Sequence, residues 1–138
     1  MASSAAHDTG PDGAGPPEPR LLCDARALAG DPSAAAGVLW KLAESGRQLD
    51  ANLVRLAPGA RVAPHAEPDL DVLVYVVSGG GTLGAGPRDE RRELTEGATV
   101  WLPHGSTRSL GAGPDGLVYL TLHRRRPGMR IRSRKEGS

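Results

Sequence analysis

Residues 59–79 read GARVAPHAEPDLDVLVYVVSG, and residues 97–108 read GATVWLPHGSTR. Each stretch sets a short apolar run between glycine and proline. Valine and tyrosine favour the pleated, half-buried surface of a strand, whereas glycine and proline favour turns. Both stretches therefore predict short strands that end at tight turns.

The pattern continues outward from these two stretches. We expect strands over residues 38–42, 51–56, 61–65, 71–77, 82–84, 91–94, 98–102, 107–110 and 117–123. Residues 79–81, three glycines, are expected to end a hairpin and not to cradle a phosphate, because no helix follows them. Short strands at this spacing, without helical periodicity between them, are typical of an all-β barrel or sandwich.

The chain divides into four predicted regions. Residues 1–20 carry almost no large apolar side chain and are expected to be a disordered tail. Residues 21–48 form an arm that packs on the barrel, with an edge strand at 21–23, a turn at 31–33 and a helical turn at 34–36. Residues 49–123 form the barrel itself. Residues 124–138 form a basic tail.

Composition narrows the class of protein. The 138 residues suit one domain, and a net charge of +1 argues against a polyanion binder or an acidic solvating protein. The single cysteine, Cys23, cannot form an internal disulfide. The first residues lack the basic start and apolar core of a secretion signal, and the longest apolar run, 72–77, is too short to span a bilayer. We therefore expect a cytoplasmic protein without membrane contact, and the excess of Arg, Ala, Gly and Pro suggests a bacterial, GC-rich source.

The basic run over residues 124–135 has two interpretations. It is a solvated tail, laid on the barrel by Met129 and Ile131, or a site for an acidic partner. Aromatic residues do not interleave with the basic ones and no helix-turn-helix precedes them, which argues against nucleic acid.

The two quoted stretches resemble the paired motifs of the cupin superfamily. The first carries a glycine, five residues, His-x-His, then a Glu and a strand that ends in glycine; Gly59, His65 and Gly79 match the glycines and the first His. The second carries a glycine and a Pro-x-Gly turn, as Gly97, Pro103 and Gly105 do here. The resemblance covers residues 49–123 and implies a jelly-roll barrel, a double-stranded β-helix.

The resemblance also implies a metal site of three His and one Glu, from which this sequence departs. His65 matches the first His, but Glu67 stands where the second is expected. The motif's Glu falls on either Asp71 or Val72, depending on the direction of counting. Arg108 stands where the last His is expected, and an arginine does not ligate a metal. His65, Glu67 and Asp71 are the candidate ligands for a divalent Fe, Mn or Zn ion.

The remaining histidines are expected to lie outside such a site. His104 is placed in a solvent-exposed turn. His123 shares a strand face with Tyr119 and Thr121, opposite a fully apolar face, and is expected near the surface or an interface. The side chains expected to contact a ligand at the barrel mouth are His65, Glu67, Tyr75, Trp101 and Arg108.

Three functions follow from these residues. The first is a non-enzymatic or weakly catalytic cupin that holds a small molecule, anions included, in the barrel mouth near Arg108. The alternative for the same residues is a hydrogen-bonded polar pair of His65 and Glu67, with a carboxylate neutralising Arg108. The second is a metal-dependent dioxygenase or isomerase with an atypical site at His65, Glu67 and Asp71. The third is a structural or partner-binding homodimer that pairs through its sheets.

Overall fold

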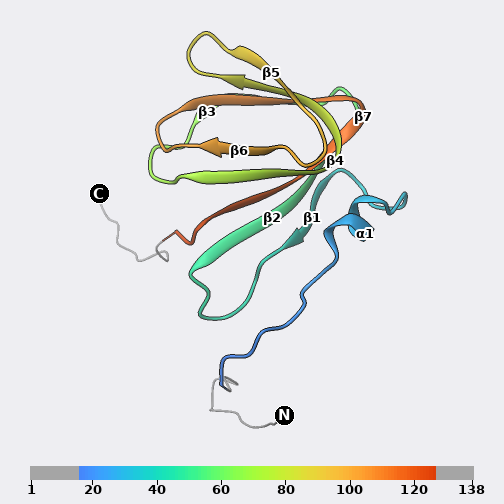
Figure 1. The fold of residues 1–138 in the computed structure, drawn as a ribbon, viewed down its shortest axis with the longest axis vertical. Coiled ribbons are helices and arrows are strands. Elements are labelled where there is room, and N and C mark those ends of the chain that lie inside the picture. Colours follow the sequence, from blue (N-terminus) through green and yellow to red (C-terminus); the bar gives the residue numbers. More distant parts are fainter. Residues whose placement is uncertain (1–15, 127–138) are drawn as a thin grey trace.

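The computed structural model describes residues 16–126, so most of the predicted N-terminal tail and of the basic tail lies outside the described residues. The described elements, in chain order, are α1 (Ala25–Ala29), β1 (Gly37–Lys41), β2 (Leu49–Leu56), β3 (Arg61–Ala66), β4 (Val72–Ala85), β5 (Glu90–Leu94), β6 (Thr99–Leu102) and β7 (Thr107–Arg124). Figure 1 shows that the strands curl into an open barrel, which confirms the all-β prediction.

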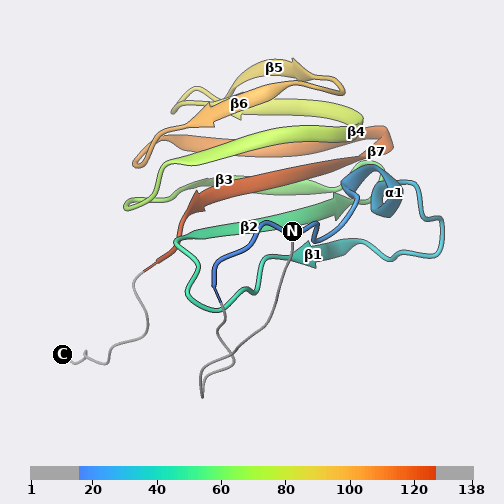
Figure 2. The same cartoon turned by 60° about the horizontal axis from the view of Figure 1, so that its bottom comes forward.

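All strand pairs are antiparallel, and two long strands hold the barrel together. The hydrogen-bonded order is β1-β2-β7-β4-β5, with β3 on β7 and β6 on β4. The first part of β7 pairs with β3, and its second part pairs with β2. The strand β4 in turn pairs with β6 near its start and with β5 near its end. Because both long strands change partners midway, they bend the sheet around a common interior (Figure 2).

The length of β4 and β7 corrects two predictions. Residues 79–81 do not end a hairpin, since β4 runs on to Ala85, and residues 107–123 form one strand instead of two. Register shifts interrupt the β4–β7 ladder between Val76 and Ser78 and between Gly79 and Gly81. A Cβ on Gly81 would lie 1.9 Å from the carbonyl oxygen of Gly111, so glycine lets the two strands cross closely here. The glycines that read as turns are therefore bulges in continuous strands.

The sheet buries apolar side chains on both faces. The inner face holds the main core, made of Leu70, Val72, Val74, Val76, Leu83, Leu94, Leu102, Leu117 and Tyr119. A second cluster on the outer face consists of Leu53, Val77 and Val118, against which Ala25, Leu28 and Ala29 of α1 pack. Figure 2 shows α1 beside the ends of β1 and β2.

The arm before β2 differs from its prediction. Residues 21–23 form no strand and residues 34–36 no helical turn; instead the helix is α1. The Asp24 side chain caps α1 by accepting hydrogen bonds from the backbone N–H groups of Arg26 and Ala27, at 3.0 and 3.1 Å. The predicted strand at 38–42 is confirmed as β1. No helix within residues 16–126 is long and apolar enough to cross a membrane.

Candidate functional site

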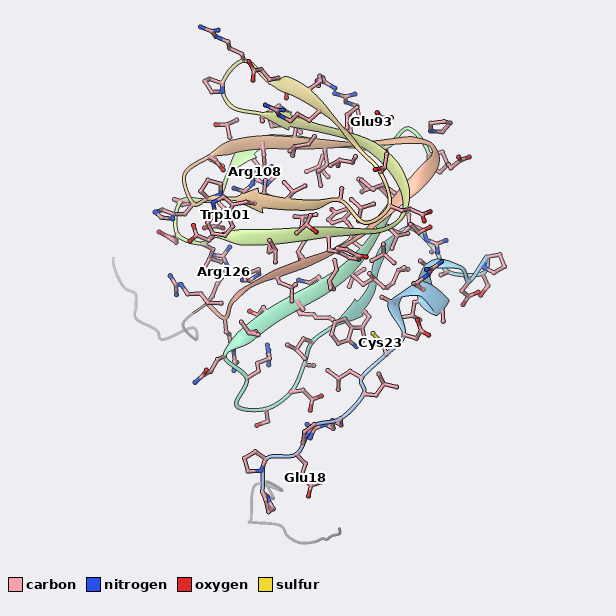
Figure 3. The ribbon with its side chains drawn as sticks, in the orientation of Figure 1. Glu18, Cys23, Glu93, Trp101, Arg108 and Arg126 are labelled. Atoms are coloured by element: carbon pink, nitrogen blue, oxygen red, sulfur yellow. The ribbon has the colours of Figure 1, made fainter. Side chains whose placement is uncertain are left out.

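A cavity of about 290 Å³ opens at one end of the barrel, between β3, the start of β4 and both parts of β7. Its floor is apolar and is made of Val62, Leu70, Val72, Val74, Leu102 and Leu110. Polar side chains stand around this floor, namely His65, Glu67, Arg108, Tyr119, Thr121, His123 and Arg126. Figure 3 shows Arg108 and Arg126 toward the same end of the molecule, away from Cys23 and Glu18 on the N-terminal arm.

Arg108 is the buried cation of this cavity. It lies on β7 between His65 of β3 and Ala85 of β4, and only 6% of its surface is exposed. Its Nη1 donates to the carbonyl oxygen of Ser106 at 3.3 Å and to that residue's hydroxyl at 3.4 Å. Both partners are neutral, and within residues 16–126 no carboxylate forms an ion pair with Arg108.

His65 is the register partner of Arg108 in the β3–β7 ladder. Its Nδ1 lies 3.0 Å from the carbonyl oxygen of Ala63. A carbonyl oxygen only accepts, so Nδ1 carries the proton and Nε2 is left for another partner. His65 is exposed, at the rim of the cavity and not at its floor.

Glu67 forms its ion pair with Arg126, while the charge of Arg108 acts on the carboxylate without direct contact. Its Oε1 accepts from Nη2 of Arg126, and its Oε2 accepts from the backbone N–H of Asp69 at 2.9 Å. The Arg126 hydrogen bond, then the Asp69 hydrogen bond and the nearby positive charges hold the pKa of the Glu67 carboxyl below its usual range. Arg126 lay in the part of the sequence expected to be a basic tail, so nothing in its local pattern marked it as a cavity residue.

His123, which was expected near the surface or an interface, is half-buried at the cavity. His123 lines the cavity together with Tyr119 and Thr121. Its Nδ1 lies 2.7 Å from the carbonyl oxygen of Arg124, so the same tautomer argument leaves Nε2 free. Burial raises the pKa of the Tyr119 phenol, which keeps that hydroxyl neutral. Polar and apolar side chains alternate along the end of β7 as the sequence predicts. The apolar side, however, is the outer face of the sheet, where α1 packs against the cluster that contains Val118 and Leu120.

Tyr75 and Trp101 do not contact this cavity. Val72, Val74 and Val76 of β4 face the interior, so the alternate residue Tyr75 points outward and is 42% exposed. Trp101 of β6 pairs with Leu73 of β4, and the residue is 60% exposed. Both residues, which were expected to contact a ligand, therefore lie on the outer surface of the barrel and not in the cavity.

Asp71 also lies outside the cavity, which separates the expected metal ligands. Its Oδ1 accepts from the backbone N–H of His104 at 2.9 Å and lies 2.8 Å from Nδ1 of that imidazole. These His104 hydrogen bonds lower the pKa of the Asp71 carboxyl. His104 is solvent-exposed, as expected. The inward position is taken by Val72, because alternation turns Asp71 to the opposite face.

The donors that remain do not fit a divalent metal. Within residues 16–126 no three His, Cys, Asp or Glu side chains are grouped so that they could hold an ion. Of the two candidate ligands in the cavity, Glu67 is paired with Arg126, and His65 is the register partner of Arg108 in the β3–β7 ladder. A guanidinium cannot ligate, and its charge opposes a cation.

No family model matches the sequence, and no curated protein does. Solved structures do match. KdgF from a Halomonas species is 30% identical, with a TM-score of 0.54, and the match covers 65% of this chain and 80% of that one.

Two further solved structures share the fold. A sugar phosphate isomerase from a cupin superfamily, from Silicibacter pomeroyi, is 24% identical with a TM-score of 0.52; the match covers 59% of this chain and 53% of that one. A conserved protein with a double-stranded β-helix domain from Klebsiella pneumoniae has a TM-score of 0.60 at 14% identity, over 75% of this chain and 83% of that one. With the barrel and both motif scaffolds in place, the chain belongs to the cupin superfamily.

Proposed function

We propose that this cupin binds a small organic anion in its cavity, and that Arg108 receives the carboxylate of that ligand. The observation that supports this proposal is a buried guanidinium that lines the cavity without a carboxylate partner in the described part of the chain. Burying a charge is costly unless the charge is paired. An anionic ligand supplies the missing counter-charge.

The chemistry of Arg108 suits a carboxylate. A guanidinium presents several N–H donors in a planar fork that matches the two oxygens of a carboxylate. The donation from Nη1 to Ser106 holds the side chain in place while its other donors stay available. The free Nε2 of His65 and the neutral Tyr119 hydroxyl add polar contacts around the same space.

Metal-dependent catalysis has less support. It requires Asp71 beside His65 and Glu67, and Asp71 is bonded to His104 outside the cavity. It also requires Glu67 to leave Arg126.

Calorimetric titration with isovalerate and benzoate tests the anion proposal. The wild-type chain is compared with Arg108→Gln, and with Arg92→Gln as the control, since Arg92 is exposed on β5 away from the cavity. Loss of a charge-assisted contact of about 1.5–3 kcal/mol predicts roughly 10- to 100-fold weaker binding in Arg108→Gln. Circular dichroism checks that the variant is folded. Equal affinity in a folded Arg108→Gln variant would rule the proposal out.

A second candidate function rests on the outer face of the sheet. Leu73, Tyr75 and Trp101 form an exposed apolar stripe on β4 and β6. The stripe continues the face on which α1 and β1 residues already cover Val77 and Val118. We propose that a second copy of the chain covers it, because a two-fold pair sets the same patch against itself.

Sedimentation analysis tests this pairing. We expect a dimer for the wild type and a monomer for Trp101→Glu, with Leu49→Glu as the control, since Leu49 is equally exposed but lies at the start of β2. A monomeric wild type, or a Trp101→Glu variant that remains dimeric, contradicts the pairing.

A further inference from the structure

The charges around the cavity are unequally balanced. Arg108 and Arg126 contribute two positive charges, and Glu67 contributes the single carboxylate among the described lining residues. Glu67 is paired with Arg126, so one positive charge, on Arg108, is left over. The cavity is therefore one negative charge short of balance.

Glu67 is fixed in its pairing. Both of its oxygens accept hydrogen bonds, one from Arg126 and one from the Asp69 backbone. Its side chain is only 16% exposed, whereas that of Arg126 is 55% exposed. The lowered pKa keeps the carboxylate ionised at neutral pH.

Arg126 is also held at the cavity mouth. The backbone N–H of Arg125 donates to the carbonyl oxygen of Gln48 at 2.8 Å. Nη2 of Arg124 donates to the carbonyl oxygen of Asp69 at 3.2 Å. These bonds on the two preceding residues anchor the end of β7 beside the loop that carries Glu67.

Below the polar side chains the floor of the cavity is apolar, and the space is small. The volume of about 290 Å³ lies at the lower end of the usual range for small-molecule sites. The floor residues, Leu70 and Val74 among them, offer no hydrogen-bonding side chain. A ligand that fits this site carries one charged end and a short hydrocarbon body.

We propose that Glu67 is a specificity-determining residue that makes this cavity selective for apolar monocarboxylates over dianions. This inference rests on the proposed anion site at Arg108. A single carboxylate balances Arg108 and leaves the Glu67–Arg126 pair intact. A second anionic group meets the Glu67 carboxylate, which repels it, or has to displace Glu67 from Arg126 and leave that carboxylate half-buried and unpaired.

Paired titrations test the selectivity. Isovalerate and benzoate are the monoanion probes, and glutarate and inorganic phosphate are the multiply charged probes. Each is titrated into wild type, Glu67→Gln and Glu93→Gln; Glu93 is an exposed carboxylate on β5 and serves as the matched control. We expect wild type and Glu93→Gln to prefer the monoanions, and Glu67→Gln to shift the affinity ratio toward glutarate by about tenfold or more.

A second variant removes the other member of the Glu67–Arg126 pair, so that the selectivity does not depend on Glu67→Gln alone. Arg126→Gln leaves Glu67 ionised without its partner, so isovalerate binding is expected to weaken by roughly fivefold or more through like-charge repulsion. An unchanged affinity ratio in Glu67→Gln, or a wild type that binds glutarate as tightly as isovalerate, overturns the selectivity while leaving the Arg108 site standing. If wild type binds no carboxylate, the anion site itself fails and the selectivity fails with it.

Discussion

His65 on β3 and Arg108 on β7 stand directly opposite each other in the antiparallel ladder, and both line the same cavity. In the related motifs these two positions are where the resemblance implies metal-ligating histidines. Here one carries an imidazole and the other a permanent positive charge. A guanidinium at this position repels a metal ion and suits an anion, which is why the proposals above concern anions.

The Glu67–Arg126 pair makes a pH-dependent contribution to stability. The pKa of Glu67 is lowered in the folded chain, so the contribution is present above the usual glutamate pKa of about 4.3 and is lost as the pH falls through the lower folded value. We expect Glu67→Gln to lower the melting temperature at about pH 7 and to differ less from wild type at about pH 3. Melting curves for both chains, with Glu93→Gln alongside, measure this. A gap that widens on acidification would contradict the assignment.

Leu53 anchors the outer apolar cluster and is fully buried. Leu53→Ala leaves a cavity between the sheet and the α1 side of the molecule, so we expect a loss of about 2–5 kcal/mol in the free energy of unfolding. Urea denaturation measures the loss. Leu49→Ala is the control, because Leu49 is exposed at the start of β2 and its truncation is expected to change stability by about 0.5 kcal/mol or less. A loss of about 0.5 kcal/mol or less in Leu53→Ala would contradict a stabilising role for the outer cluster.

Substitutions at Gly81, within β4, and at Gly86, directly after it, separate a steric need for glycine from a conformational one. A Cβ at Gly81 meets the Gly111 carbonyl oxygen at 1.9 Å, so Gly81→Ala has to push β4 away from β7 and is expected to cost about 3 kcal/mol or more. Gly86 has φ +77° and open space around it, so Gly86→Ala carries only backbone strain of about 1–2 kcal/mol. Denaturant unfolding ranks the two variants. A larger cost at Gly86 would contradict the close crossing of the strands.

Metal content is expected to be substoichiometric. The donors in the cavity are one exposed imidazole and one carboxylate that is already paired with a guanidinium. Elemental analysis of protein expressed with added Fe, Mn and Zn measures the content. One metal ion per chain in wild type, lost in His65→Ala, would overturn this expectation and revive the metal-enzyme alternative.

Much of the barrel could be read from residue types alone. Val72, Val74 and Val76 alternate with more exposed residues, and this period fixes a strand with one face inward. Gly97 and Gly105 take positive φ at turns, as the motif pattern required. The glycines at 79–81 predict a turn, but β4 continues through them to Ala85. The conformational freedom that permits a turn at glycine also permits a bulge in a continuous strand.

Which face of each strand points into the barrel could not be predicted from the alternation of residue types. Along the end of β7, Val118 and Leu120 alternate with Tyr119, Thr121 and His123, and the more apolar face was assigned to the interior. Alternation separates two faces but does not say which one meets the core when both are covered. Here α1 covers the outer face, and the capping signal at Asp24 was the one local clue to that helix.

By itself, the sequence determined the barrel and the replacement of metal donors by Glu67 and Arg108, because strand period, turn residues and side-chain chemistry are local properties. Only the tertiary structure decided which charges meet. Glu67 pairs with Arg126, 59 residues away, and Arg108 is left without a carboxylate in the described chain. That outcome depends on where β7 ends relative to the loop between β3 and β4, and a long-range register of this kind is set by the packing of the whole barrel.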